Sequence, residues 1–331
     1  MKHSRAKILL LLAGGLCGVT AAVACLCLTA HGHGDAQTRE HKASPPPTLD
    51  VLVGLQSTGL AATGIARMNL LCQQGLSGTE GLDINRALSL IDQMAVRVKA
   101  ETQRHLYRFE RNRGEFENSE GFFRMVMMGV VLTEDFGIHY NPRQRTAPAE
   151  TGPDDGFFAD PQMVFLGGLL GPGRQGTCSS LPVLYVAVGR QLGYPLKLVT
   201  TRGHLFVRWE GSRERFNIEV TGRGVSRFED DYYRHWPFEI SAAEEAAEGY
   251  LKSLSPAEEL AVFLSIRGMC LRESGHLAEA AESFATASRL SPGTQSYQQM
   301  ADALGLKRGT ERRNAGDKSA SIQRDASHSK L

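Results

Sequence analysis

Cys178, His204 and the pair Asn217 and Glu219 stand in the order that a thiol-based nucleophilic site needs. Cys178 lies in the segment Gly-Thr-Cys-Ser-Ser, at the start of a predicted helix over residues 178–192. His204 opens a predicted strand, and Asn217 and Glu219 lie on the strand after it. A helix start and two neighbouring strands would bring a sulfur, an imidazole and an orienting polar group together.

The expected chemistry begins with the thiol of Cys178, which is a good nucleophile only as a thiolate. A helix N-terminus offers partial positive charge and free N–H groups, and an imidazolium at His204 would add a full positive charge. The same N–H groups can hold the oxyanion of a tetrahedral intermediate. His204 would then return its proton to the leaving group.

The imidazole needs a partner on its second nitrogen, and the predicted strand over residues 215–221 offers two. Side chains alternate along a strand, so Asn217 and Glu219 face the same side. Glu219 would stabilise an imidazolium by charge, whereas Asn217 would only orient it. Both residues remain candidates for this position.

Each residue also has an ordinary structural interpretation. Cys178 would be a core thiol, His204 a turn histidine with a locally satisfied N–H, and Glu219 an exposed strand carboxylate. Any one of these is the commoner situation, but the combined spacing favours a reactive site. His235 is a rival base that follows the strands, and His276 is expected to be solvated.

The elements that must position these residues follow from local patterns. Gly193 and the following Tyr194-Pro195 end the helix that starts at Cys178. Residues 196–200 predict a strand before His204, with Arg202-Gly203 as the turn between the two strands.

The preceding part of the chain has a different pattern. Residues 50–136 carry apolar side chains at helical spacing, ending in a strongly apolar helix over 122–136. Residues 140–162 contain four prolines and predict a long loop.

The composition limits the functional classes. The 331 residues suffice for one or two domains, and a formal net charge of +1 gives no basic field for nucleic acid. Of the six cysteines, three lie in the apolar N-terminal stretch. Cys72, Cys178 and Cys270 are too widely spaced for a disulfide framework or a zinc site, and Cys72 and Cys270 are predicted to be buried.

The N-terminus carries a candidate membrane segment. Residues 8–30 are uncharged and mostly apolar, and as a helix they would span about 35 Å. This length favours a signal anchor within residues 1–30; a cleaved signal peptide, giving a secreted protein, and a lipoprotein acylated at Cys25 are the alternatives. Each places the bulk of the chain outside the cytoplasm. Residues 31–48 contain three consecutive prolines and predict an extended linker.

The C-terminal part is predicted to be helical over residues 241–306. Ala280, Phe284 and Pro292 fall where a tetratricopeptide repeat prefers these residue types, and one such repeat is recognisable. A single repeat cannot bury its own face, so it should pack on the preceding domain, and it offers a surface for a protein partner. Residues 307–331 are polar and predict a disordered tail.

Several segments resemble the transglutaminase-like superfamily of papain-type thiol enzymes, in a bacterial branch with helices before and after the core. The likeness covers about residues 52–292. Its specific matches are the segments 176–181, 184–185, 192–195 and 203–208.

This resemblance implies an α+β fold. A papain/transglutaminase-like core within residues 49–240 would pack the helix carrying Cys178 on a small antiparallel sheet, with a helical N-terminal region and C-terminal tetratricopeptide-like helices. It also implies a Cys-His-Asp triad without a metal or organic cofactor. Cys178 and His204 match, but Glu219 stands where the family usually has Asp. The signs of the calcium-dependent cross-linking enzymes are absent, so cross-linking is not implied.

Two functions from different classes follow. The first is an exported, membrane-tethered thiol-dependent amidase, peptidase or acyl transferase with a Cys178-His204-Glu219 triad and a peptide or protein substrate in the cell envelope. The second is a non-catalytic transglutaminase-like and tetratricopeptide binding or assembly protein of the same compartment.

Overall fold

The computed structural model describes residues 48–141, 156–222 and 224–305. The predicted membrane segment, all but the last residue of the linker, the predicted tail and most of the predicted loop lie outside these ranges. Within them no helix combines the length and apolar character needed to cross a membrane.

The N-terminal part is helical, as the apolar spacing predicts. Buried side chains on α3, such as Met68 (1% exposed) and Cys72 (0%), confirm the expected inward face. Asp83 caps α4 through a 2.9 Å hydrogen bond from the Arg86 N–H to its carboxylate. The elements here are α1 (Leu49–Val53), α2 (Ser57–Thr63), α3 (Ile65–Gln73), α4 (Ile84–Arg111), the 3₁₀ helix η1 (Arg113–Phe116) and α5 (Glu120–Glu134).

A four-stranded antiparallel sheet forms the centre of the fold, in the order β3-β4-β5-β6. The turn between β3 and β4 has two residues, Arg202 and Gly203, because Thr201 pairs with His204. Gly203 has φ +69°, which a glycine adopts without strain. The strands are β3 (Leu196–Thr201), β4 (His204–Glu210), β5 (Arg215–Gly222) and β6 (Gly224–Phe228). The first three match the predicted strands, and β6 was not predicted.

The two faces of this sheet pack against different layers. One face belongs to the main core, and its side chains are Leu196, Leu198, Leu205, Val207, Trp209, Phe216, Ile218 and Val220. The other face carries Val199 and Phe206 in a smaller core completed by Tyr233, Ile240 and Leu251. His204 and Glu219 alternate onto this second face.

Helix α8 (Leu181–Gln191) packs on the main-core face, where it contacts β3, β4 and β5. Its start is later than predicted, because Cys178 lies in the turn that precedes it. Before that turn, β2 (Gln175–Gly176) pairs in parallel with β1 (His139–Tyr140), and α6 (Pro161–Val164) and α7 (Leu166–Leu169) lie between them in the sequence.

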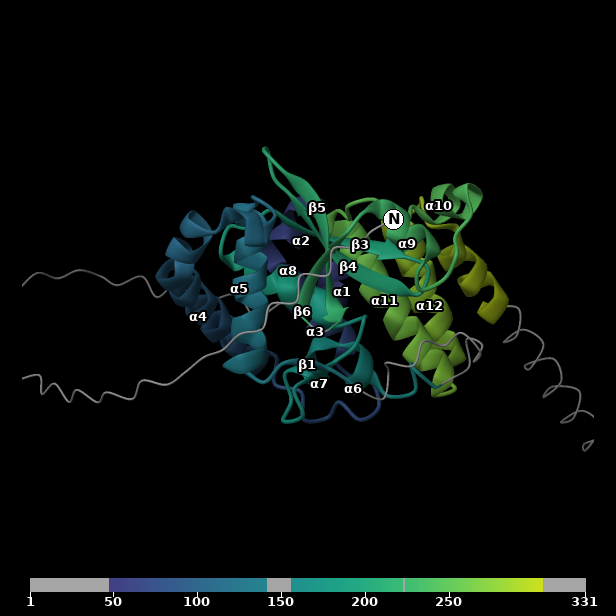
Figure 1. Ribbon diagram of the computed structural model, residues 1–331. Coiled ribbons are helices and arrows are strands. Elements are labelled where there is room, and N and C mark those ends of the chain that lie inside the picture. The colour runs from purple at the N-terminus through teal and green to yellow at the C-terminus, as the bar shows by residue number, and fades with distance from the viewer. Residues whose placement is uncertain (1–47, 142–155, 223, 306–331) are drawn as a thin grey trace, which may run out of the picture. The chain divides into compact units, whose positions relative to one another are not determined.

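The C-terminal helices pack on the rest of the fold, as expected for a helical pair that cannot bury its own face. In Figure 1, α11 (Pro256–Glu273) and α12 (Leu277–Leu290) run side by side as a hairpin, and α11 also contacts α3. Arg267 of α11 donates to the carbonyls of Cys72 and Gln74 at 2.8 and 2.9 Å.

Shorter helices complete this part of the chain: α9 (Asp230–His235), α10 (Ala242–Glu248) and a helical segment over residues 295–305. The tetratricopeptide character of the hairpin and the predicted domain boundaries at 240 and 306 stay predictions.

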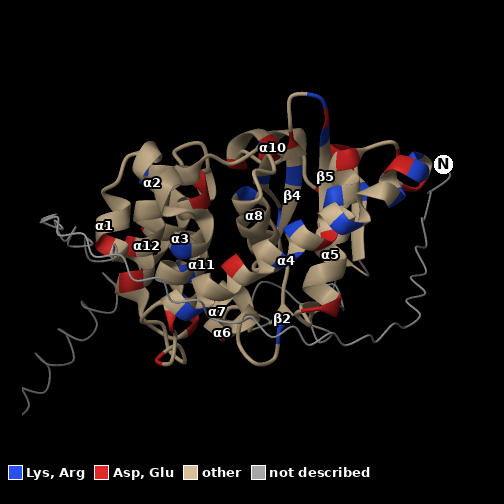
Figure 2. Ribbon diagram, turned by 90° about the vertical axis from the view of Figure 1, so that its left-hand side faces the viewer, with Lys and Arg blue, Asp and Glu red and all other residues tan. Residues whose placement is uncertain are grey.

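Lys and Arg residues are interspersed with Asp and Glu residues along the described elements (Figure 2). The fold is α+β with a small antiparallel sheet, which confirms the predicted fold class.

Candidate active site

Cys178 lies in the turn immediately before α8, half-buried rather than sealed in the core. The Thr177 hydroxyl donates to the Met163 carbonyl at 2.9 Å, and the Ser180 hydroxyl accepts from the Thr177 N–H at 3.0 Å. The first helical bond of this end runs from the Leu181 N–H to the Thr177 carbonyl at 3.0 Å. These bonds fix the backbone on both sides of the sulfur and present it at the N-terminal end of the helix.

The backbone N–H of Cys178 is left available at this helix end. The N–H of Ser179 binds the Thr177 hydroxyl at 3.2 Å and that of Ser180 binds the Thr177 carbonyl at 3.3 Å. Among the described residues, no acceptor takes the Cys178 N–H. An unpaired N–H beside the sulfur can hold an oxyanion that forms on a carbonyl attacked by that sulfur.

His204 and Glu219 form a buried pair beneath this turn. The imidazole Nε2 lies 2.8 Å from Oε2 of Glu219, and the two residues are only 5% exposed each. Because Nε2 is taken by the carboxylate, Nδ1 is the nitrogen left for a second partner. Cys178 is near enough to His204 to raise the pKa of its imidazole, and the Cys178 sulfur lies 3.9 Å from the carbonyl of the preceding residue, Gly203.

The charges of this pair reinforce each other. Burial acts to lower the pKa of His204, but the Glu219 charge and hydrogen bonds to Cys178 and Glu219 outweigh it and raise the pKa to about 9. Burial acts to raise the pKa of Glu219, but the His204 charge and several hydrogen bonds hold it below its ordinary value. At neutral pH the pair is therefore an imidazolium and a carboxylate.

Two further residues contact the carboxylate of Glu219. Thr221 donates its N–H at 2.8 Å and its hydroxyl at 2.5 Å, both to Oε1. The Tyr233 hydroxyl lies 3.4 Å from Oε2, on the side that faces His204. Sequence reasoning missed both residues, because the contact of Thr221 depends on the irregular end of β5 and Tyr233 comes from α9, a separate element.

Asn217 does not reach the imidazole, contrary to one of the two options left open by the sequence. It lies opposite Arg208 in the β4–β5 register. Its side-chain oxygen accepts from Nε of Arg208 at 2.7 Å, and its amide nitrogen donates to Asp230 at 2.7 Å. Arg208 is 1% exposed and also binds Asp230 at 2.6 Å. Asn217 therefore belongs to a buried network that joins β4, β5 and α9.

Aromatic rings surround the imidazole on its remaining sides. Trp236 meets His204 edge-on, with the ring centres 4.7 Å apart. Tyr233 stacks on Phe206 at 3.7 Å and lies parallel to the imidazole at 6.3 Å. These rings exclude water from the imidazole and restrict its movement.

The other histidines and cysteines of interest lie elsewhere. The His235 side chain is 63% exposed and lies 3.9 Å from Asp231, and His276 is exposed with Ser274 at 3.1 Å. Cys72 and Cys270 are buried, as predicted, and burial raises the pKa of each thiol to about 12.

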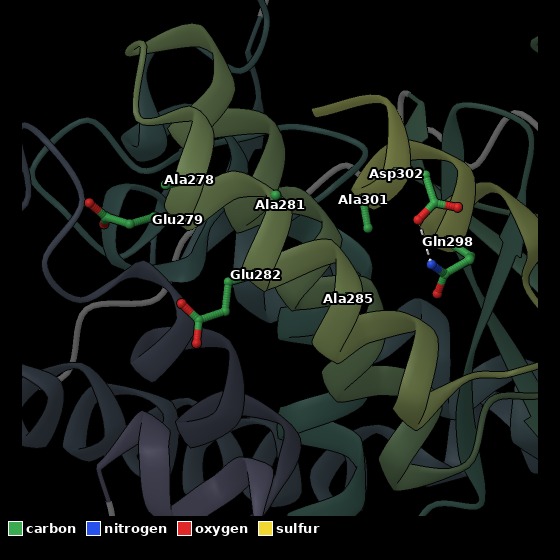
Figure 3. Close-up of a pocket in the computed structure, with 8 residues that line it drawn as sticks. All are labelled: Ala278, Glu279, Ala281, Glu282, Ala285, Gln298, Ala301 and Asp302. Carbon is green, nitrogen blue, oxygen red and sulfur yellow. Dashed lines mark hydrogen bonds between the residues drawn. The ribbon is translucent and has the colours of Figure 1, made fainter. Parts of the chain in front are cut away.

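No group of three or more His, Cys, Asp or Glu side chains within the described ranges is arranged to hold a metal ion. A groove of about 580 Å³ lies between α12 and the helical segment 295–305, and none of the candidate site residues lines it. Figure 3 shows its lining.

Residues 151–264 match the family model of the transglutaminase-like superfamily. This part of the chain is a transglutaminase-like domain, as the resemblance implied, and the match continues past residue 240 into α11. Neither the curated proteins nor the solved structures contain a match.

Proposed function

We propose that this chain, with its transglutaminase-like domain, is a thiol-dependent enzyme that cleaves an amide bond by acyl transfer. The observation that carries the proposal is the buried His204–Glu219 pair, 2.8 Å apart, beside the half-buried Cys178, whose sulfur lies 3.9 Å from the carbonyl of Gly203, the residue before His204. The carboxylate keeps the imidazole protonated, and a positive imidazolium favours a negative sulfur beside it.

In the first step the Cys178 thiolate attacks the carbonyl carbon of the amide. The carbonyl π electrons move to its oxygen, and the Cys178 N–H lies where it can donate to that oxyanion. When the intermediate collapses, the C–N bond breaks and His204 gives its proton to the departing amine. A thioester on Cys178 remains, with His204 neutral.

In the second step neutral His204 takes a proton from an incoming nucleophile. Water gives a carboxylic acid and makes the enzyme an amidase or peptidase, whereas an acceptor amine makes it an acyl transferase. The nucleophile bonds to the thioester carbonyl carbon, and when this second intermediate collapses the C–S bond breaks and the Cys178 thiolate leaves beside the His204 imidazolium, which restores the starting site. Glu219 remains ionised throughout and supports the imidazolium each time that it forms.

The proposed location is outside the cytoplasm, with the chain held at a membrane by residues 8–30. The proposed substrate is accordingly a peptide or protein of the envelope. The mass of the mature N-terminus separates the anchored form from a secreted protein or a lipoprotein.

Labelling with iodoacetamide at about pH 6 tests the nucleophile without a known substrate. An ordinary thiol with a pKa of about 8.5 is well under 1% ionised at this pH, so Cys178 should react at least about tenfold faster than a free cysteine peptide. Cys72 and Cys270 are internal controls, because both are buried, and mass spectrometry should find them unlabelled in the native protein.

The acyl-transfer step is tested with a chromogenic ester. The protein should form a thioester at Cys178, and Cys178→Ala should form none. If Cys178 labels no faster than the free peptide and Cys178→Ala retains all hydrolysis, the enzymatic proposal is wrong.

A binding or assembly function is the second candidate, and the groove in Figure 3 favours it. Four alanines and three carboxylates line it, together with Gln298; the residues are Ala278, Ala281, Ala285, Ala301, Glu279, Glu282 and Asp302. The substitution Ala281→Arg would fill the groove. Binding partners that the Cys178→Ala protein retains and the Ala281→Arg protein loses would support this function.

A further inference from the structure

The strand β5 is irregular immediately after Glu219. Its pairing with β6 is regular up to Glu219 and Ser226, and the register then shifts before Gly222 pairs with Gly224. Thr221 lies inside this irregular stretch, and its N–H points to the Glu219 carboxylate at 2.8 Å. A shift in register leaves some backbone groups of a strand without their regular hydrogen bonds to the neighbouring strand. It also changes the direction in which a side chain points.

The two oxygens of Glu219 have separate partners as a result. Oε1 accepts from the N–H and hydroxyl of Thr221, and Oε2 lies against His204 and Tyr233. A glutamate side chain has three free torsions, so burial alone does not define where its carboxylate points. Donors on both oxygens fix the plane of the carboxylate and leave Oε2 directed at the imidazole.

We propose that Thr221 is a positioning residue that holds the longer side chain of Glu219 in the place where it orients the imidazole of His204. Thr221 lies two positions after Glu219, and both its N–H and its hydroxyl reach the Glu219 carboxylate, which also contacts His204. The inference rests on the proposed function only in assigning His204 to the reactive site, because the held geometry is measurable without turnover.

The titratable groups that face His204 within the described residues come from three parts of the chain. Glu219 comes from β5, Cys178 from the turn before α8, and Tyr233 from α9. Thr221 reaches the imidazole only through Glu219. Losing the Thr221 hydroxyl would leave Oε1 buried with one donor fewer, and the carboxylate would turn to find another.

Thr221→Val is the test, because valine keeps the shape and the backbone N–H and removes only the hydroxyl donor. If the carboxylate turns away, its negative charge opposes the effect of burial less strongly. The pKa of His204 should then fall by roughly one unit. NMR titration of the imidazole measures this shift.

Matched variants separate positioning from ordinary stabilisation. Thr221→Ser keeps the hydroxyl and should restore the pKa of His204 to that of the unaltered protein. Tyr233→Phe removes the longer 3.4 Å contact and should shift the pKa of His204 less than Thr221→Val does. Thr221→Ala gives the same test should the valine variant fail to fold.

A role for Thr221 in stability alone predicts another outcome. The variant would then unfold at lower denaturant while the pKa of His204 stayed the same or rose, and that result overturns the proposal. This failure differs from failure of the proposed function, in which Cys178 is unreactive in the unaltered protein whatever Thr221 does to His204.

Discussion

Arg190 of α8 and Glu259 of α11 form a paired salt bridge, with guanidinium-to-carboxylate distances of 2.5 and 3.0 Å. The Glu259 side chain is completely buried and that of Arg190 is 31% exposed. Nε of Arg190 also donates to the Leu196 carbonyl at the start of β3, at 3.0 Å. One guanidinium therefore ties the helix that follows Cys178 to the sheet and to the C-terminal hairpin.

Removing this cation should be costly. Arg190→Met leaves Glu259 buried without a counter-charge, and urea unfolding should show a loss of about 3 kcal/mol. Burial already raises the pKa of Glu259 against the influence of Arg190, so the carboxyl would protonate at higher pH in the variant.

The matched control is the exposed pair of Arg202 and Glu244, whose side chains are 54% and 45% exposed. Arg202→Met should change stability by less than about 1 kcal/mol. The double variant Arg190→Met with Glu259→Met should recover most of the loss, because it removes both charges. Equal effects for the buried and exposed pairs would contradict the structural role given to Arg190.

Substitutions at Glu219 and at Asn217 should have different effects on the pKa of His204. Glu219→Gln removes the charge that opposes burial, so the pKa of His204 should fall from about 9 to its ordinary value or below. Asn217→Ala should leave that pKa in place, because its amide binds Arg208 and Asp230. Asn217→Ala should instead lower the free energy of unfolding by about 1–3 kcal/mol, because it leaves unpaired polar groups in the buried network. NMR titration and urea unfolding of both variants check the pair, and equal pKa shifts would show that the assignment to Glu219 is wrong.

The sequence indicated which candidate site residues lie together better than it indicated the contacts that hold them. The turn at Arg202-Gly203 and the alternation along β4 and β5 are local, and local patterns sufficed to place His204 and Glu219 together. The choice between Glu219 and Asn217 depended on which residue of β4 lies opposite, and register between strands is set by long-range packing.

The unpredicted elements have weak local patterns. Strand β6 is short, begins at a glycine and alternates only partly, so its sequence gives little indication of pairing. Thr221 was missed as a partner of Glu219 because its contact depends on the irregular end of β5, which no local spacing specifies.

The turn between β4 and β5 is attached to the start of α5 through Glu214. Its carboxylate accepts from the Ser119 hydroxyl at 2.5 Å and from the Gly121 N–H at 3.0 Å. A carboxylate at a helix N-terminus satisfies free N–H groups and complements the helix dipole. Glu214→Ala should therefore lower the free energy of unfolding by about 1–2 kcal/mol. Arg213→Ala, an exposed change in the same turn, is the control and should have almost no effect in the same urea titration.

The buried His204–Glu219 pair should make stability depend on pH in a defined direction. The pKa of His204 is about 9 in the folded protein and about 6.5 when unfolded, so between these values the folded state binds more protons. Its stabilising contribution is complete below about pH 6.5 and is lost as the pH rises through about 9. Glu219 behaves oppositely: its lowered pKa contributes stability above its ordinary value, lost as the pH falls through the folded value. Urea unfolding from about pH 6 to 9 should show a decrease of up to about 3 kcal/mol that His204→Gln lacks. Parallel pH dependence in the two proteins would mean that the imidazole is not held as an imidazolium by Glu219.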